Sequence, residues 1–103
     1  MIHVVAIITA KPGMREAVLR EFGANVSNVL AEAGCIEYGP AVDTEVLGPA
    51  QAMLGPDTFV VVEKWDSADA LKAHAAAPHM RDYARRTRDM IANRAIHVLA
   101  PAG

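Results

Sequence analysis

Several features that would define a compartment or a partner are missing from this sequence. It contains one cysteine, Cys35, so no internal disulfide can form, and this suits a reducing compartment. No apolar stretch approaches the ~20 residues of a membrane-spanning helix. Residues 1–5 also lack the cationic segment of a signal peptide. The net charge is -2, so no basic field attracts nucleic acid. We therefore expect a cytoplasmic protein that binds neither membrane nor nucleic acid.

Motifs for common cofactors and nucleophiles are missing too. The chain has no nucleophile elbow, no phosphate-binding loop and no dinucleotide fingerprint. Its four histidines show no spacing typical of metal ligands, such as H-E-x-x-H. Cys35 is better explained as a small hydrophobic strand residue than as a nucleophile. The sequence thus predicts no metal site and no cofactor.

The chain does contain clear strand and helix patterns, within a length of 103 residues that suits one domain, residues 1–103. Residues 2–9 predict a strand that is apolar on both alternate sets of positions, as in a strand buried on both faces. Residues 14–33 predict an amphipathic helix, ended by Gly34. Its inner stripe would be Met14, Val18, Phe22, Val26, Val29, Leu30 and Ala33, and its outer side Arg15, Glu16, Arg20, Glu21 and Glu32. Residues 35–42 then predict a second strand.

The second half repeats the order of strand and helix. Residues 59–65 predict a strand, interrupted by Glu63, and Asp66 or Ser67 could cap a following short helix. Pro78 ends that helix because proline cannot continue its hydrogen-bond ladder. A further helix over residues 79–91 and a last strand over residues 95–100 complete the chain.

These elements give the order β-α-β-β-α-β, which predicts an α+β, ferredoxin-like fold with a four-stranded antiparallel sheet. Its helices can cover only one face of the sheet, so a monomer would expose an apolar patch on the other. We therefore expect a homodimer with sheet packed on sheet. Residues 43–56, which contain two Gly-Pro pairs, are too apolar for a solvated linker, and we expect them to pack against a partner or over a pocket.

Four short segments carry a resemblance to a known family: G-C-I-E-Y at residues 34–38, E-K-W at 63–65, A-L-K-A-H at 70–74 and P-H-M at 78–80. The chain resembles the antibiotic biosynthesis monooxygenase domain family over nearly its whole length. The resemblance implies a dimeric α+β barrel. It also implies oxidation of a phenolic or hydroquinone substrate by O2 without flavin, haem or metal.

Candidate site residues follow from these segments. His74 would be the general base, because imidazole titrates near neutral pH. Trp65 would be a wall on which an aromatic substrate stacks, and Tyr38 or Tyr83 would donate to a developing oxyanion. The remaining candidates for substrate binding are Glu63 and His79. Each candidate can also be explained by structure alone. Glu63 would then be a paired carboxylate at a strand end, Trp65 a core aromatic and His79 a helix-start residue. His74 would be a core or surface histidine, and the two tyrosines would be half-buried.

Two other functions stay open. One is the haem-degrading branch of the same fold, whose members carry an asparagine on the first strand; residues 2–9 contain none, so we discount it. The other is a non-catalytic, dimeric small-ligand-binding or regulatory domain. Turnover with hydroquinones separates that domain from an enzyme.

Overall fold

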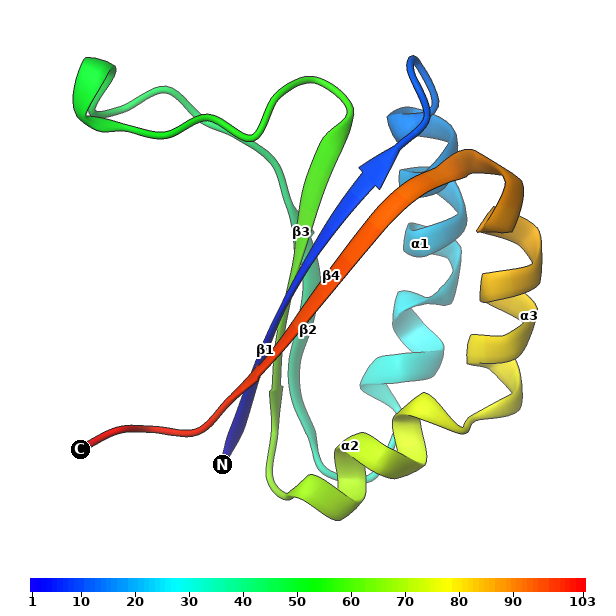
Figure 1. Ribbon diagram of the computed structural model, residues 1–103. Helices are drawn as coiled ribbons and strands as arrows, with labels where there is room; N and C mark the ends of the chain where they lie inside the picture. The colour runs from blue at the N-terminus through cyan, green and yellow to red at the C-terminus, as the bar shows by residue number, and fades with distance from the viewer.

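A single antiparallel sheet forms one layer of the molecule, and all the helices lie against one of its faces (Figure 1). The computed structural model describes residues 1–103. The strand order is β2-β3-β1-β4. The central strands are β1 (Ile2–Ala10) and β3 (Thr58–Trp65), and the edges are β2 (Cys35–Ala41) and β4 (Ile91–Leu99). This arrangement confirms the predicted α+β class and the β-α-β-β-α-β order.

Three α-helices form the second layer: α1 (Arg15–Leu30), α2 (Ala68–Ala75) and α3 (Pro78–Thr87). The Ser67 side chain caps α2 by accepting a hydrogen bond from the Ala70 N–H at 3.1 Å, as predicted. Pro78 begins α3, where its missing N–H has no consequence. Short 3-10 turns occur at Gly48–Ala50 and Arg88–Met90. None of the helices is long and apolar enough to cross a membrane.

Three predicted boundaries are wrong. The first helix is predicted to run to residue 33 and to end at Gly34, whereas α1 ends at Leu30 with Ala31 as its C-cap. The last helix was predicted to reach residue 91 and the last strand to begin at residue 95, whereas Ile91 already pairs with Ala10 in the sheet. The Lys11 N–H also bonds the Met90 carbonyl at 2.8 Å, which joins the end of β1 to the start of β4. The inner stripe of α1 differs as well, because Leu30 is exposed and Asn25 is buried in its place. Asn25 lies three residues after Phe22 and four before Val29, so it shares their face.

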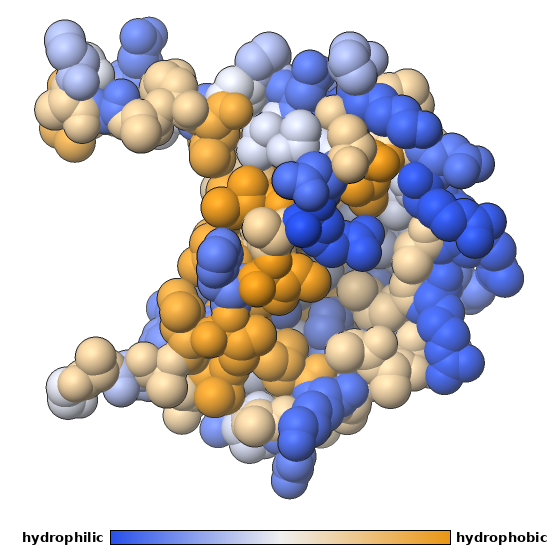
Figure 2. Space-filling model, in the orientation of Figure 1, coloured by the Kyte–Doolittle hydropathy of each residue, from blue (hydrophilic) through white to orange (hydrophobic).

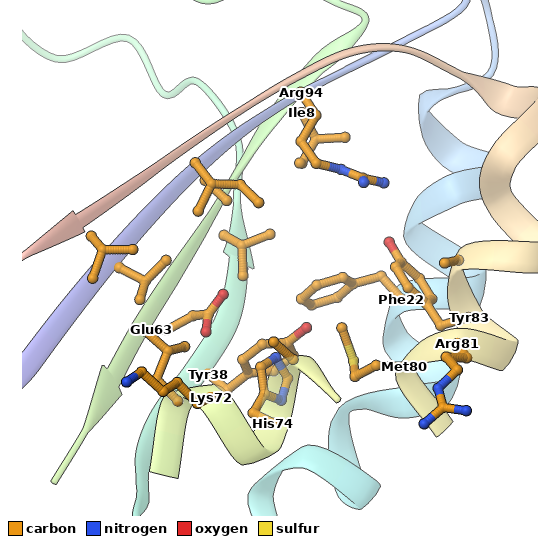
Figure 3. A pocket seen from close by; sticks show the side chains of 18 of the residues that line it. Ile8, Phe22, Tyr38, Glu63, Lys72, His74, Met80, Arg81, Tyr83 and Arg94 are labelled. Atoms are coloured by element: carbon orange, nitrogen blue, oxygen red, sulfur yellow. The ribbon is translucent and has the colours of Figure 1, made fainter. Parts of the chain in front are cut away.

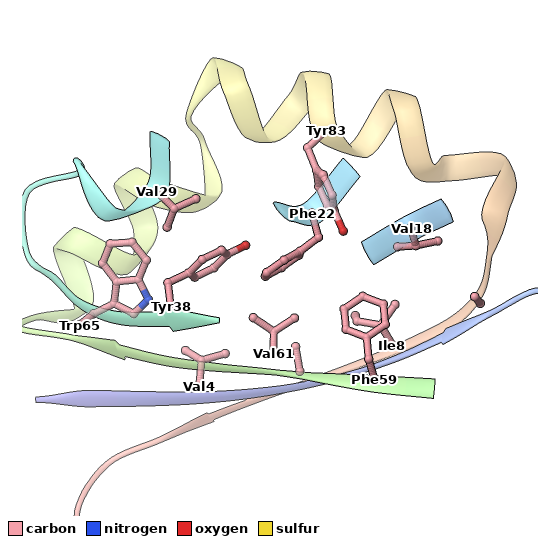
Figure 4. Packing of buried hydrophobic residues seen from close by; sticks show 12 residues of the cluster. Val4, Ile8, Val18, Phe22, Val29, Tyr38, Phe59, Val61, Trp65 and Tyr83 are labelled. Atoms are coloured by element: carbon pink, nitrogen blue, oxygen red, sulfur yellow. The ribbon is translucent and has the colours of Figure 1, made fainter. Parts of the chain in front are cut away.

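The core lies between the sheet and the helices (Figure 4). Antiparallel register places Val4 opposite Glu63, and alternate residues of β1 and β3 point toward the helices. The rings of Phe22, Phe59 and Trp65 are almost fully buried there. This packing fixes which side chains of β3 can line a site beneath the helices.

The opposite face of the sheet has no helix over it, and its central residues are only half-buried (Figure 1). Residues 43–56 extend beyond that side of the sheet, and hydrophobic side chains cover much of the surface between them and the C-terminal tail (Figure 2). The loop is held by its own hydrogen bonds, in which the Asp43 carboxylate accepts from the N–H groups of Leu54 and Gly55. Val46 and Leu47 are 74% and 68% exposed, and no residue of the loop lines a cavity, so the loop does not pack over a pocket. Packing of this loop against a partner stays a prediction.

Candidate active site

A cavity of ≈ 470 Å³ lies between the helix-facing side of the sheet and helices α2 and α3 (Figure 3). Fourteen of its 19 lining residues are hydrophobic, so the cavity suits an apolar ring. Apart from two tyrosines, the charged or ionisable lining residues are Glu63, Lys72, His74, Arg81 and Arg94. Figure 3 shows Glu63, Tyr38 and His74 gathered at one end of the cavity, with Arg94 away from them.

His74 is the best-positioned base in the cavity. Helix α2 carries it against the sheet, and only 5% of the residue is exposed. Its Nδ1 lies 2.8 Å from a carboxylate oxygen of Glu32. A carboxylate accepts hydrogen bonds, so Nδ1 carries the proton, and in the neutral ring Nε2 then holds the lone pair. The ring also lies between Trp65, with centroids 4.7 Å apart, and Tyr38, at 5.5 Å. The imidazole is therefore fixed in both orientation and tautomer.

Glu32 is the site residue that sequence reasoning missed. We expected it on the outer side of the first helix, but α1 ends at Leu30 and Glu32 lies in the following turn. Gly34 shapes that turn with a φ of +85°, and a Cβ there would come within 2.6 Å of the Ala70 Cβ. The Gly34 carbonyl accepts from the Asp66 N–H at 2.9 Å, which docks the turn on the start of α2. This docking brings the Glu32 carboxylate to His74.

Glu63 and Trp65 form a second pair. The Trp65 indole N–H donates to the Glu63 carboxylate at 2.9 Å. Glu63 is 7% exposed and lines the cavity, and burial raises the pKa of its carboxyl. Trp65 is 0% exposed and is not part of the cavity wall. In this structure Trp65 therefore lies behind the site, where it supports Glu63 and His74.

Two tyrosines add hydroxyl groups to the cavity wall. Tyr38 stacks on Phe22, with ring centroids 5.1 Å apart, and Tyr83 meets the edge of the same ring at 6.0 Å. Burial raises the pKa of both hydroxyls above their ordinary value, so both stay protonated at neutral pH. They can donate a hydrogen bond to a bound substrate but are not candidate bases.

His79 lies beside the site without lining the cavity. The Asn25 side-chain amide donates to its Nδ1 at 3.1 Å, and the Asn28 side-chain amide in turn donates to Asn25 Oδ1 at 3.0 Å. The buried Nε2 of His79 has no hydrogen-bond partner and lies 3.5 Å from the Glu32 carboxylate. His79 Nε2 therefore lies beside the same Glu32 oxygen that His74 Nδ1 contacts. No three His, Cys, Asp or Glu side chains lie close enough together to hold a metal ion.

Of the predicted site residues, the structure brings His74, Glu63, Tyr38 and Tyr83 together on the cavity wall. It places Trp65 and His79 behind that wall. A histidine and a buried carboxyl group on the wall of an apolar cavity, here His74 and Glu63, are typical of a site for proton transfer.

Comparison with known proteins shows the family to which the chain belongs. The sequence matches the antibiotic biosynthesis monooxygenase family over residues 1–86. The match spans most of the chain, and the protein belongs to this family. This confirms the resemblance drawn from the four short segments.

One sequence relative and two solved structures are similar to the chain over almost its whole length. The chain is 37% identical over 103 residues to the Escherichia coli protein named "Probable quinol monooxygenase YgiN", and the match covers 98% of both chains. Among solved structures, PA3566 from Pseudomonas aeruginosa has a TM-score of 0.80 at 29% identity, covering 99% of this chain and 94% of that one. Rv0793 from Mycobacterium tuberculosis also has a TM-score of 0.80, at 24% identity, with 99% and 95% of the two chains covered. The last similarity shows the shared fold.

Proposed function

We propose that this protein is a cytoplasmic, cofactor-independent monooxygenase that oxidises a hydroquinone or related phenol with O2. The observation that carries the proposal is the His74–Glu32 pair, a fixed and buried imidazole on the wall of an apolar cavity. Membership of the family supports a monooxygenase reaction. The name of the Escherichia coli relative, a probable quinol monooxygenase, supports a quinol as the substrate class.

The first step is removal of a phenolic proton. The substrate ring enters the apolar cavity with one hydroxyl directed at His74 Nε2, which accepts the proton. The imidazolium that forms keeps its Nδ1 hydrogen bond to Glu32, now between two opposite charges and therefore stronger. Glu32 thus stabilises the charge that appears on His74 as the phenolate forms.

The phenolate then supplies the electrons for O2. A ring carbon next to the phenolate forms a C–O bond to O2, and the resulting peroxide anion takes the proton held by His74 to become a hydroperoxide. His74 then removes the hydrogen of the same ring carbon, the C–H electron pair forms the new C=O bond, and the O–O bond breaks. The departing hydroxide takes that proton from His74 and leaves as water. A hydroquinone and one O2 thus give one hydroxyquinone and one water. The ring loses four electrons, one oxygen atom enters the product, and the other enters the water.

Donors for the developing negative charge line the cavity. Tyr38 and Tyr83 offer protonated hydroxyls, and burial favours the neutral, donating form of the Glu63 carboxyl. Trp65 holds Glu63 in place through its indole N–H. Because all three donors sit in an apolar cavity, their hydrogen bonds to an oxyanion are stronger than they would be in water.

The proposal is tested by measuring O2 uptake by the purified protein with a panel of hydroquinones and anthrone-like phenols, without added cofactor. Uptake that depends on both substrate and protein supports the enzyme. Binding of these compounds without O2 uptake would instead favour a non-catalytic ligand-binding domain. A shifted Soret band on mixing with haemin would favour the haem-degrading branch.

We also propose that the protein is a homodimer through the open face of the sheet. Val5, Ile7, Val60 and Val62 are only half-buried in a single chain, although they lie on central strands. Residues 43–56 present further exposed hydrophobic side chains on the same side of the molecule (Figure 2). Packing two such faces together would bury both, as the exposure of a large apolar patch requires.

A further inference from the structure

Three cations of the cavity wall have no acidic partner. Lys72, Arg81 and Arg94 all line the cavity, and none of them forms an ion pair with a carboxylate. Arg94 lies opposite Ile8 in the register of β1 and β4, which places it on the helix-facing side of the sheet. Its guanidinium points into the space between the sheet and α3 (Figure 3). A guanidinium in this position is available to a ligand.

Two neighbouring arginines, in contrast to Arg94, are already paired with carboxylates. Arg85 pairs with Asp82, and Arg86 pairs with Glu21 at 2.8 Å, both on the outer surface. Arg81 uses one N–H to bond the Ala76 carbonyl at 3.1 Å, which fixes its side chain next to the cavity. Arg85 and Arg86 are therefore held in surface ion pairs, whereas Arg81 and Arg94 have no carboxylate partner at the cavity.

The free arginines extend from the cavity to a second hollow. This hollow, of ≈ 610 Å³, adjoins the cavity and shares Arg81, Ala84, Ile91 and Arg94 with it. Arg85 and Arg88 complete its basic lining. Residues 78–98 contain five arginines and two aspartates, although the whole chain has a net charge of -2. The lining of this hollow thus contains four arginines and no acidic side chain.

The two ends of the cavity therefore carry different groups. One end holds Glu63, His74 and Lys72, whereas Arg94 lies apart from them near Ile8 (Figure 3). The walls between them are apolar. A ligand that matches this pattern has a phenolic hydroxyl at one end, an aromatic body and an anionic group at the other.

We infer that the substrate is a hydroquinone or phenol that bears a carboxylate, with the carboxylate bound by Arg94 at the mouth of the cavity. This inference rests on the proposed function for the identity of the ring. Arginine suits a carboxylate because its planar guanidinium can donate two parallel hydrogen bonds. Held in this way, the anionic group directs the ring hydroxyl that lies farther from it, the meta hydroxyl of 2,5-dihydroxybenzoate, toward His74.

The test compares 2,5-dihydroxybenzoate with unsubstituted hydroquinone, using O2 uptake at low salt. We expect KM to be about tenfold lower for the carboxylate, since hydrogen bonds to charged groups are the stronger ones. Arg94→Gln should remove this preference and change kcat little. Arg20→Gln, which removes the same charge from the exposed side of α1, should keep it.

Binding measured by calorimetry without O2 separates this inference from the proposed function. Turnover of neutral hydroquinone with an equal or lower KM would overturn the anionic site and leave the oxygenase standing. Binding of 2,5-dihydroxybenzoate that depends on Arg94, with no O2 uptake from any substrate, would support the anionic site and overturn the oxygenase. Absence of both binding and uptake would overturn both.

Discussion

Replacement of Glu32 by glutamine tests the role of the carboxylate next to His74. The change keeps the shape of the side chain and its ability to accept the Nδ1 hydrogen bond at 2.8 Å, but removes the charge. A hydrogen bond to a charged group contributes about 1.5–3 kcal/mol, against about 0.5–1.5 kcal/mol for a neutral one. The difference of about 1–2 kcal/mol applies to the imidazolium formed during proton transfer. We therefore expect Glu32→Gln to lower kcat by roughly 5- to 30-fold.

The assay is steady-state O2 uptake, with Glu16→Gln as the matched control because that carboxylate is exposed on the first turn of α1. The double variant Glu32→Gln/His74→Ala decides whether the two residues act together. If Glu32 acts through His74, adding Glu32→Gln to His74→Ala should cause no further loss. If Glu32→Gln lowers kcat by the same factor in the wild-type and His74→Ala proteins, the reasoning is refuted.

Four further predictions follow from the site and the fold. His74→Ala should lower kcat by about 10²-fold or more and leave the far-ultraviolet circular dichroism spectrum unchanged. Burial raises the pKa of Glu63 above its ordinary value of 4.5, so ionisation of this carboxyl opposes folding. Glu63→Gln removes the ionisable group and should therefore stabilise the protein increasingly as pH rises above 4.5. Equal shifts of the melting temperature at pH 4 and pH 7.5 would contradict this. Gly34→Ala should cost about 1–2 kcal/mol or more in denaturant unfolding, because its φ is +85° and its Cβ would overlap Ala70. Val62→Lys should dissociate the proposed dimer, and light scattering that finds wild-type monomer near 11 kDa at micromolar concentration would refute that dimer.

The sheet and most helices were predictable because their signals are local. The apolar positions of residues 2–9 and 59–65 indicate strands, Ser67 is a good helix cap, and Pro78 must interrupt a helix. The end of α3 was not predictable in this way. Ile91 suits both the inner face of a helix and a strand, and only its pairing with Ala10 decides between them.

The candidate site was predictable in part. His74 and Glu63 stand out because each interrupts an apolar pattern, and the structure brings both to one cavity. Glu32 gave no such signal, since its position depends on how the Gly34 turn docks against α2. The position of Trp65 behind His74 likewise depends on tertiary packing. The sequence shows that an indole is present but not which of its faces is covered.

The most direct test of the central claim is turnover of a hydroquinone under ¹⁸O2 by the purified, colourless protein. The mechanism predicts one O2 consumed for each hydroxyquinone formed, with one ¹⁸O atom in the product and the other in water. It also predicts that the reaction needs no added flavin, haem or metal. No O2 uptake, or a product without ¹⁸O once exchange with water has been measured, would contradict the claim.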